Sequence, residues 1–542
     1  MGEVLVNALI IVVKCIYRKQ YFGMITMEKY LNTKTFSLFT INGKEYLGEM
    51  ELGNIESKLV IHLNDFHSSG SDIQYVTYIK GKLLPDSKRV TFVDATLIDI
   101  NDSHNLVANG NYERMQKLTF DLRFIIFGND SISDSEKCFN SIKFFIPDAS
   151  TLFLYDSFDM IFNMKKENVK DILEEENKKT QNLYGISKDM ADYRFGDNST
   201  VYIDTGANVL HCFDIEAGVI KIKNNISSNI SSNKGFKVGN NISCVFESNE
   251  LMGFFKILES SYPIVNLFEL ILGKRQFLRE YKISVKNYVE ESKEYQVYQV
   301  KENSNNKNIM MHPISRLVYI ENEPAESESL LNNWILRQKE WKFARSEFFE
   351  VFTKKYYSSD LLIKVANLFD IIPDNAYEQS EKISDELLQA KDKCKDILKD
   401  LPISSDKDSI LGALGRIGKK NLRGKIRDRY SIIENSGLAT LDEIDTVIGN
   451  AVNCRNFFVH GSPGKFDYME NFSQIPFFIN TLSFIYGASE LIELGWSFKN
   501  WEPDELNFHP FSSYLISYSS NLDELKDVLS LAKESKKENK PS

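Results

Sequence analysis

The side chains with the clearest potential for chemistry are Arg455, Asn456 and His460, which fall within one short stretch of the chain. Arginine carries a fixed positive charge, and histidine is the side chain that exchanges a proton most readily near neutral pH. An imidazole can therefore take and return a proton while a guanidinium stabilises negative charge on the reacting group. This combination predicts acid–base chemistry on an anionic substrate.

The residues before this stretch predict a helix over 440–460, because apolar side chains recur there at helical spacing and Gly461 follows as a stop signal. Arg455 falls on the apolar stripe, so it must pair with a buried acid or face a cleft that holds an anion. Asn456 and His460 are four residues apart and share one helix face, where the amide can orient the imidazole. Arg455 and His460 are separated by about 140° around the helix, so we expect them to flank a substrate rather than touch. The helix dipole favours the protonated ring of His460 in this last turn.

A second feature is a strongly basic segment that precedes this helix. Seven basic residues face a single acid, Asp428, between positions 416 and 429: Arg416, Lys419, Lys420, Arg423, Lys425, Arg427 and Arg429. In a chain whose net charge is −11, such a segment is a local electrostatic footprint suited to phosphates, and we interpret it as a candidate RNA contact. A solvated helix face remains the alternative.

The rest of the sequence divides into a β-rich part and a helical part. Short alternating segments punctuated by turn residues run to about residue 310, which indicates a sandwich or barrel. Asn42-Gly43 predicts a hairpin turn, and the Asn- and Ser-rich stretch 224–241 predicts an exposed loop. Beyond an acidic joint at 321–329 we expect helices over 330–355, 359–371, 376–400, 407–434, 440–460, 474–495 and 521–537.

Individual residues sharpen the helical part. Thr440 and Glu443 have the spacing of a capping box at the start of the 440–460 helix. The helix from Gln474 is apolar on nearly all sides, so it should run through the middle of a bundle. Trp334 is expected to be a core or interface anchor, and Cys454 to be a small buried hydrophobe rather than a nucleophile.

Composition limits the classes of protein that remain. A length of 542 residues suggests two to four domains, and 42% hydrophobic with 26% charged residues excludes wholesale disorder. The six cysteines show no CxxC or regular spacing, which favours a reducing, cytoplasmic location. The apolar run at 4–13 is too short to span a membrane. Without a Walker loop, dinucleotide fingerprint or HExxH motif, we expect no cofactor and no metal.

Arg455, Asn456, His460 and the following Gly461 resemble the Arg-x4–6-His motif of the HEPN superfamily, a group of helical-bundle ribonucleases common in bacterial defence and toxin systems. A long β-rich half ahead of a helical half is similar to the layout of ApeA-type antiphage proteins. The resemblance implies metal-independent RNA cleavage, with tRNA a common target, and a homodimer in which two motif helices form one composite site. A phage protein is a candidate trigger, although the sequence itself does not reveal what activates the protein.

The sequence therefore predicts an α+β protein of two parts: an N-terminal β-rich, sandwich- or barrel-like domain and a C-terminal all-α HEPN bundle. The expected boundaries are an extension over 1–27, a regulatory β-rich domain over 28–310, a linker over 311–329, a HEPN-like domain over 330–515, and a final helix and tail over 516–542. Two rival functions stay open: a non-catalytic dimeric binding module that recognises a phage or host ligand, and a metal-dependent hydrolase of another fold.

Overall fold

The computed structural model describes residues 30–538 apart from short gaps. Those gaps are 31, 42–43, 54–56, 64–74, 85–86, 107–111, 133–137, 154–157, 185–198, 205–207, 232–234, 277, 279, 286–292, 301–314, 321–322, 355, 378–383, 419 and 505–506. The expected extension over 1–27 lies outside the described residues. The chain divides into two compact units: a β-rich unit over 1–150, 155–262 and 277–310, and a helical unit over 151–154, 263–276 and 311–542.

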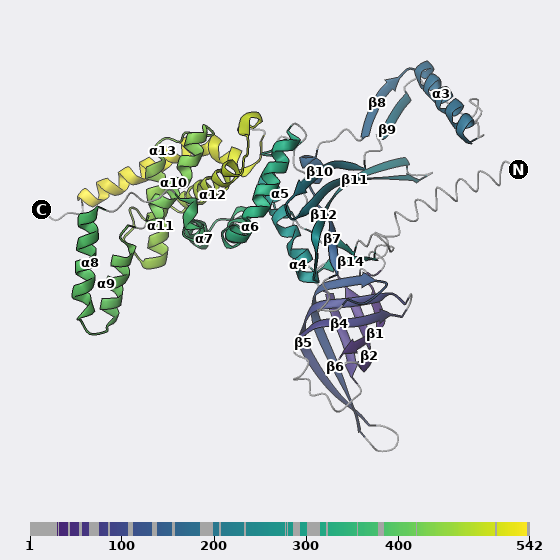
Figure 1. Cartoon of the computed structure of the whole chain (residues 1–542), viewed down its shortest axis with the longest axis horizontal. Coiled ribbons are helices and arrows are strands. Elements are labelled where there is room, and N and C mark those ends of the chain that lie inside the picture. Colours follow the sequence, from purple (N-terminus) through teal and green to yellow (C-terminus); the bar gives the residue numbers. More distant parts are fainter. Residues whose placement is uncertain are drawn as a thin grey trace. The chain divides into compact units, whose positions relative to one another are not determined.

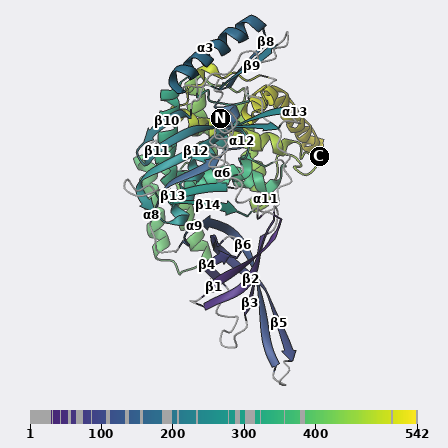
Figure 2. The same cartoon turned by 90° about the vertical axis from the view of Figure 1, so that its right-hand side faces the viewer.

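The β-rich unit begins with a closed barrel of six antiparallel strands (Figure 1). Its strands are β1 Lys34–Ile41, β2 Lys44–Leu52, β3 Ser57–Leu63, β4 Tyr75–Leu83, β5 Arg89–Leu106 and β6 Tyr112–Gly128. They follow the order β6-β3-β2-β1-β4-β5, and β5 pairs again with β6 to close the barrel. β5 and β6 are the longest of the six, as Figure 2 shows. The predicted sandwich- or barrel-like β-rich domain is confirmed and contains a barrel. Ile41 pairs with Lys44 in an antiparallel hairpin, and the predicted turn residues Asn42-Gly43 lie outside the described residues.

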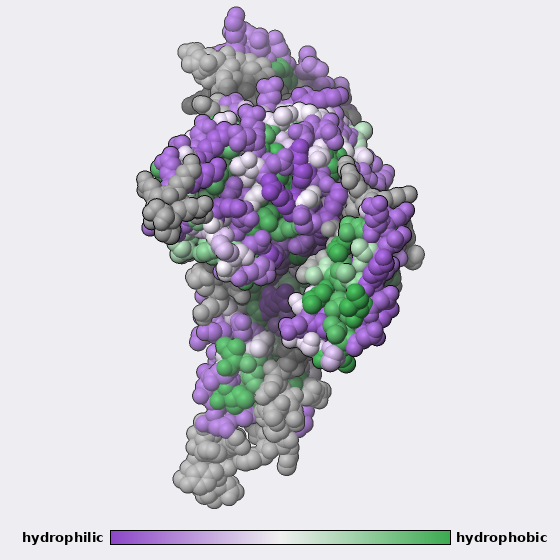
Figure 3. Space-filling model, turned by 90° about the vertical axis from the view of Figure 1, so that its left-hand side faces the viewer, coloured by the Kyte–Doolittle hydropathy of each residue, from purple (hydrophilic) through white to green (hydrophobic). Residues whose placement is uncertain are grey.

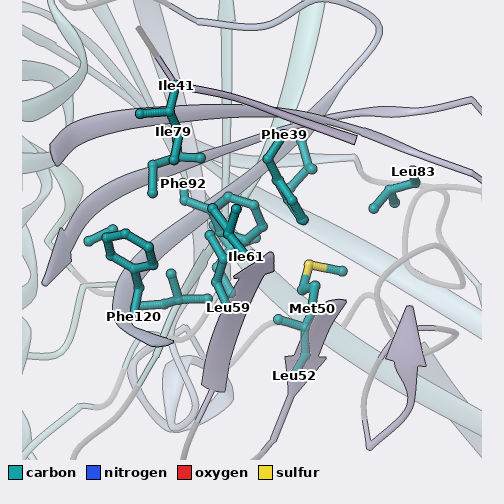
Figure 4. Packing of buried hydrophobic residues seen from close by; sticks show 14 of the residues in the cluster. Phe39, Ile41, Met50, Leu52, Leu59, Ile61, Ile79, Leu83, Phe92 and Phe120 are labelled. Carbon is teal, nitrogen blue, oxygen red and sulfur yellow. The ribbon is translucent and has the colours of Figure 1, made fainter. Parts of the chain in front are cut away.

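The barrel has a packed apolar interior (Figure 4). In β1 every second side chain is buried, and Phe39 is fully buried in the interior, although the buried face also holds Thr35 and Ser37 while Phe36 is exposed. Its ring lies so close to Gly48 and Gly81 that a Cβ at either glycine would approach it to 2.8 Å. Both positions therefore require glycine for close packing rather than for a special backbone angle.

β6 also starts an open antiparallel sheet, in the order β6-β14-β13-β7-β12-β11-β10. These strands are β7 Phe139–Phe145, β10 Val209–Ile215, β11 Gly218–Ser231, β12 Gly235–Met252, β13 Glu280–Val285 and β14 Lys293–Gln299. A separate pair is formed by β8 Phe158–Met164 and β9 Ser199–Asp204, with helix α3 Lys166–Tyr184 between them in sequence. Two short helices, α2 Ala149–Leu152 and α4 Phe254–Glu259, complete the β-rich part of the sequence.

The expectation of an exposed loop over 224–241 is wrong. β11 and β12 pair in continuous register through this stretch, from Asn224 with Ile242 to Ser231 with Gly235. The Asn225 side chain donates to the Asn241 carbonyl at 2.9 Å and accepts from Lys143 at 3.2 Å. The backbone hydrogen bonds between two strands do not depend on apolar side chains, and here side-chain amides add further hydrogen bonds. The polar composition of this stretch therefore did not indicate the long hairpin that it forms.

The helical unit consists of the following elements: α5 Ser261–Leu272, α6 Pro324–Phe352, α7 Ser359–Ile371, η3 Asp374–Ala376, α8 Asp385–Lys399, α9 Ser405–Arg416, α10 Leu422–Ser436, α11 Ile444–His460, α12 Gln474–Glu493, η4 Phe498–Asn500 and α13 Pro510–Glu538. The segment 263–276 groups with the helices, although it lies between β12 and β13 in sequence. The predicted helix 407–434 is two helices, because Gly418 adopts a φ of 89° between them.

Three further helix boundaries differ from the prediction. α8 begins at Asp385 rather than at 376, where a separate short 3-10 helix ends. α6 begins at Pro324, inside the expected acidic joint, since proline is well suited to the first turn of a helix. α13 begins at Pro510, about eleven residues earlier than expected. The prediction that Trp334 is a core residue is confirmed, because its side chain is fully buried and donates a hydrogen bond to the Pro263 carbonyl at 2.8 Å.

α12 is the core helix of the unit, as predicted, with all but a few of its side chains buried. Among the described helices it is the one long and apolar enough to cross a membrane, yet 83% of its most apolar window is buried inside the protein. Glu490 of α12 and Arg345 of α6 are both fully buried and form an ion pair at 2.6 Å. The Arg345 guanidinium also stacks on Trp334, 3.6 Å from the ring centre.

Candidate active site at the end of α11

The helix that carries the motif, α11, ends where the sequence predicts. Gly461 adopts a left-handed conformation, with φ 64°, and its N–H donates to the Phe457 carbonyl at 2.9 Å. The predicted start is wrong: the helix begins at Ile444, Glu443 adopts a left-handed backbone, and no side chain caps this end. Glu443 instead forms an ion pair with Lys526 at 2.7 Å.

The side chain of Arg455 organises the site. Its Nε and Nη2 atoms donate to Oδ1 of Asn367 on α7, at 3.2 and 2.8 Å. Its Nη1 atom lies 3.0 Å from Oδ1 of Asn456 and 3.2 Å from Nε2 of His460. The planar guanidinium therefore has three neighbours, drawn from two helices.

The expectation that Arg455 and His460 do not touch is wrong. The Cα positions diverge around the helix, but the long arginine side chain reaches along the axis to the exposed imidazole. Asn456 was expected to orient His460, and its amide oxygen accepts from Arg455 instead. Because arginine can only donate, the contact requires an unprotonated Nε2, which is the form that can act as a base.

The charge of Arg455 is oriented but not neutralised. Its hydrogen-bond partners are two amide oxygens and a neutral imidazole, and among the described residues no ion pair includes Arg455. Of the two outcomes that the sequence allowed, a buried acid or an anion, the described contacts do not show the first: amide oxygens hold the guanidinium instead. A half-buried, fixed guanidinium without an acid is a site ready for a phosphate.

The segment after Gly461 folds back on the last turns of α11. Tyr468 is buried, its ring centre lies 5.3 Å from that of Phe457, and burial raises the pKa of its hydroxyl to about 12. Cys454, in the same helix, is fully buried, and burial raises the pKa of its thiol to about 12. The prediction that Cys454 is an inert hydrophobe is consistent with this position, because the thiolate is strongly disfavoured.

The basic residues of segment 416–429 whose side chains are described lie on α10 or just before it and contact oxygen atoms. Lys420 pairs with Asp428, and Lys425 pairs with Asp370 at 3.0 Å. Arg427 lies 3.0 Å from Glu434 and 3.5 Å from Asp445, and Arg423 donates to the backbone carbonyl of Asp445 at 2.7 Å. The net positive field is therefore weaker than the sequence alone suggests.

Arg429 does not belong to this surface. Its side chain is fully buried, pairs with Glu493 at 2.9 Å and donates to Ser489 at 3.0 Å. Burial leaves no room for an RNA phosphate, so the assignment of Arg429 to RNA contact is corrected to a core role. Lys419 and the side chain of Arg416 lie outside the described residues.

Asn367 is the site residue that sequence reasoning missed. It lies on α7, far from Arg455 in sequence, and a lone asparagine within a helix gives no signal of its role. Among the described residues no group of three or more His, Cys, Asp or Glu side chains gathers in a way that could hold a metal ion.

Comparison with known families agrees with this architecture. The helical unit matches the family model described as Apea-like HEPN over residues 363–499, a range that contains Asn367, Arg455 and His460. The class defined by fold and site is thus the HEPN class. Residues 38–334 match ApeA N-terminal domain 1, which covers more than half of the chain. The chain therefore belongs to the ApeA family of HEPN proteins. No curated protein and no solved structure matches it.

Proposed function

We propose that this protein is an antiphage endoribonuclease that cleaves cellular RNA without a metal ion. The observation that carries the proposal is Arg455, a guanidinium held by neutral amides 3.2 Å from the exposed imidazole of His460. Family membership supports it, because the proposed site lies within the part of the chain that matches Apea-like HEPN. We further propose a cytoplasmic location, with tRNA as the RNA and a phage protein as the trigger.

In the proposed reaction the RNA supplies its own nucleophile. A phosphate that enters the site attracts Nη1 of Arg455, which frees Nε2 of His460 to take the proton of the 2′-hydroxyl. The 2′-oxygen then bonds to phosphorus and the bond to the 5′-oxygen breaks, leaving a 2′,3′-cyclic phosphate. The 5′-oxygen leaves as a hydroxyl after it receives a proton from the partner subunit's His460. DNA is refused because it lacks the 2′-hydroxyl.

A homodimer through the HEPN unit fits the surface around the motif. Val459, Met469 and Phe472 lie near His460 in sequence and are exposed by 41%, 66% and 41%. Apolar side chains grouped in this way are typical of surfaces that contact another protein. Two copies that meet here place two imidazoles near one substrate, so each can serve in turn as base and acid.

The decisive experiment incubates the purified protein with total RNA, with and without EDTA, and identifies the new ends. We expect cleavage in EDTA, a cyclic phosphate on one product and a 5′-hydroxyl on the other. His460→Ala should abolish cleavage without unfolding the exposed end of α11, while His62→Ala in the barrel is the matched control. Cleavage by purified His460→Ala protein in EDTA would remove the proposal.

The β-rich unit is proposed to restrain or trigger the nuclease. Phe39→Asp places a charge in the barrel interior, whereas Phe36→Asp alters a side chain on the same strand that is 52% exposed. We expect the first substitution, and not the second, to change the toxicity of the protein in growing cells. Equal growth for both variants and the native chain contradicts a regulatory barrel.

The second candidate function is a non-catalytic dimeric binding module. The pairing of Lys420, Lys425 and Arg427 with acids favours it, because neutralised lysines and arginines attract RNA less strongly. This candidate predicts that His460→Ala changes neither RNA integrity nor cell growth under conditions that activate the protein.

A further inference from the structure

The hairpin formed by α8 and α9 exposes several large apolar side chains to solvent. Lys391 of α8 donates to the Ile417 carbonyl just after α9, at 3.2 Å, and this contact helps to fix the hairpin. Six large apolar side chains of the hairpin remain exposed: Leu387 48%, Leu388 39%, Ile397 68%, Leu401 49%, Ile403 92% and Ile410 49%. Figure 3 shows apolar residues gathered along one face of this lobe. A contiguous patch of this kind marks a surface that another protein covers.

The spacing of these residues indicates that the partner is helical. One exposed stripe follows α8 with alternating intervals of three and four residues: Leu387, Ala390, Cys394, Ile397 and Leu401. A second row recurs every seven residues along α9 and its flanks: Ile403 and Ile410 are exposed, and Ile417 is half-buried. Intervals of three and four are the pattern with which helices pack side by side in coiled coils and bundles. Another face of α8 packs within the chain itself, since its Leu398 is buried.

The charges of the hairpin identify which helices fit. Residues 385–416 contain seven acidic and six basic side chains, so the hairpin is nearly neutral in a chain whose net charge is −11. A nucleic acid binds to a basic surface, and a strongly charged peptide binds to a surface of opposite net charge. The nearly neutral hairpin has neither kind of surface. A second hairpin with the same spacing and the same balanced charge meets no net repulsion.

We propose that the α8–α9 hairpin binds the same hairpin of a second copy of this chain, so that four helices share one apolar core. Two-helix hairpins that pair in this way form a four-helix bundle, and identical surfaces that meet face to face imply a two-fold axis. The proposal does not depend on RNA cleavage. If this axis coincides with the one that joins the α11 ends, the assembly is a dimer. If the two axes differ, copies joined through both surfaces form an assembly larger than a dimer.

The test compares two aspartate substitutions at equally exposed apolar positions. Ile397, in the stripe on α8, is 68% exposed, and Leu531, on α13, is 65% exposed. Sedimentation of the full-length protein gives its mass in multiples of 62.5 kDa as concentration is varied. We expect Ile397→Asp to weaken self-association by about 10²-fold, since each copy then buries an unpaired charge, while Leu531→Asp matches the native protein.

Thiol cross-linking gives an independent readout. Cys394 lies in the α8 stripe and is exposed, as is Cys212 in the β-rich unit, so the experiment is done in a Cys212→Ser background. A short bifunctional thiol reagent should link two copies, and Cys394→Ser should abolish the link. A native protein that stays monomeric, or an Ile397→Asp variant that associates like Leu531→Asp, overturns the proposal. His460→Ala should change RNA cleavage and leave the mass unaltered, so failure of either proposal is recognised separately.

Discussion

Asn367 on α7 accepts two hydrogen bonds from Arg455 on α11, from Nε at 3.2 Å and from Nη2 at 2.8 Å. This contact sets the plane of the guanidinium, and the remaining nitrogen, Nη1, then points to Asn456 and His460. A neutral amide can fix the direction of the cation without cancelling its charge, whereas a carboxylate would do both. The geometry of the candidate site is thus set by a residue outside the recognisable motif.

Asn367→Ala should lower kcat for RNA cleavage by about 10²-fold, because the guanidinium loses its orientation while keeping its charge. KM should change little, and the melting temperature should fall only slightly. Asn333→Ala is the matched control, since this half-buried asparagine donates to the Leu494 carbonyl in the same unit. Steady-state kinetics that show equal loss in both variants would contradict a positioning role for Asn367.

Arg455→Lys should reduce cleavage by about 10²–10³-fold although the charge is kept. The lysine ammonium lacks the planar, forked set of donors of a guanidinium. It therefore cannot donate to Asn367 and contact Asn456 and His460 at the same time. The measurement is the single-turnover rate at saturating protein, with RNA affinity followed in parallel. Wild-type rates in the lysine variant would show that the fork geometry is dispensable.

Cys454→Ala should leave cleavage unchanged and lower the free energy of unfolding by about 1 kcal/mol. The thiol is fully buried, and burial raises its pKa to about 12, so the reactive thiolate is not populated near neutral pH. Thiol labelling of the native protein should accordingly modify exposed Cys394 and spare Cys454. Rapid labelling of Cys454, or loss of activity in the alanine variant, would restore it as a nucleophile.

Glu269 on α5 should make stability depend on pH. Burial raises the pKa of its carboxyl from 4.5 to about 7, against the opposing effect of the bond from the Gln276 N–H. The folded state therefore binds the Glu269 proton more tightly than the unfolded state does. The contribution of Glu269 to the free energy of unfolding is complete below about pH 4.5 and is lost as the pH rises to 7. Glu269→Gln should stabilise the protein by about 3 kcal/mol at pH 8 and by much less at pH 5.

The measurement for Glu269 is the difference in melting temperature between variant and native protein at each pH. Taking the difference removes the contribution of His509, whose pKa burial lowers to about 4. An exposed carboxylate, Glu470, provides the comparison through Glu470→Gln. A Glu269→Gln effect that is constant between pH 5 and 8 would contradict the raised pKa.

Local sequence signals predicted much of this protein. The alternation of apolar and polar residues from Leu118 to Phe124 and the glycine at 461 specify a strand and a helix end through interactions between near neighbours in the chain. The hairpin over 224–241 escaped because its stabilising bonds come from the backbone and from amides, which apolar periodicity does not register. Long-range contacts such as Asn367 with Arg455 depend on how α7 and α11 pack together. The angle between two residues around a helix does not predict the reach of a long, flexible side chain. For this reason the contact between Arg455 and His460 was not predicted.

The segment 263–276 bears on how the protein can be dissected. It precedes β13 and β14 in sequence, yet Pro263 accepts a hydrogen bond from buried Trp334, and the Ile271 carbonyl accepts one from the Leu317 N–H at 3.0 Å. A truncated fragment that begins after residue 310 would lack α5 and leave these donors without acceptors. A segment of the helical unit thus lies between two segments of the β-rich unit in the sequence. A recombinant fragment of the helical unit must therefore include residues 263–276, either fused to it or co-expressed with it.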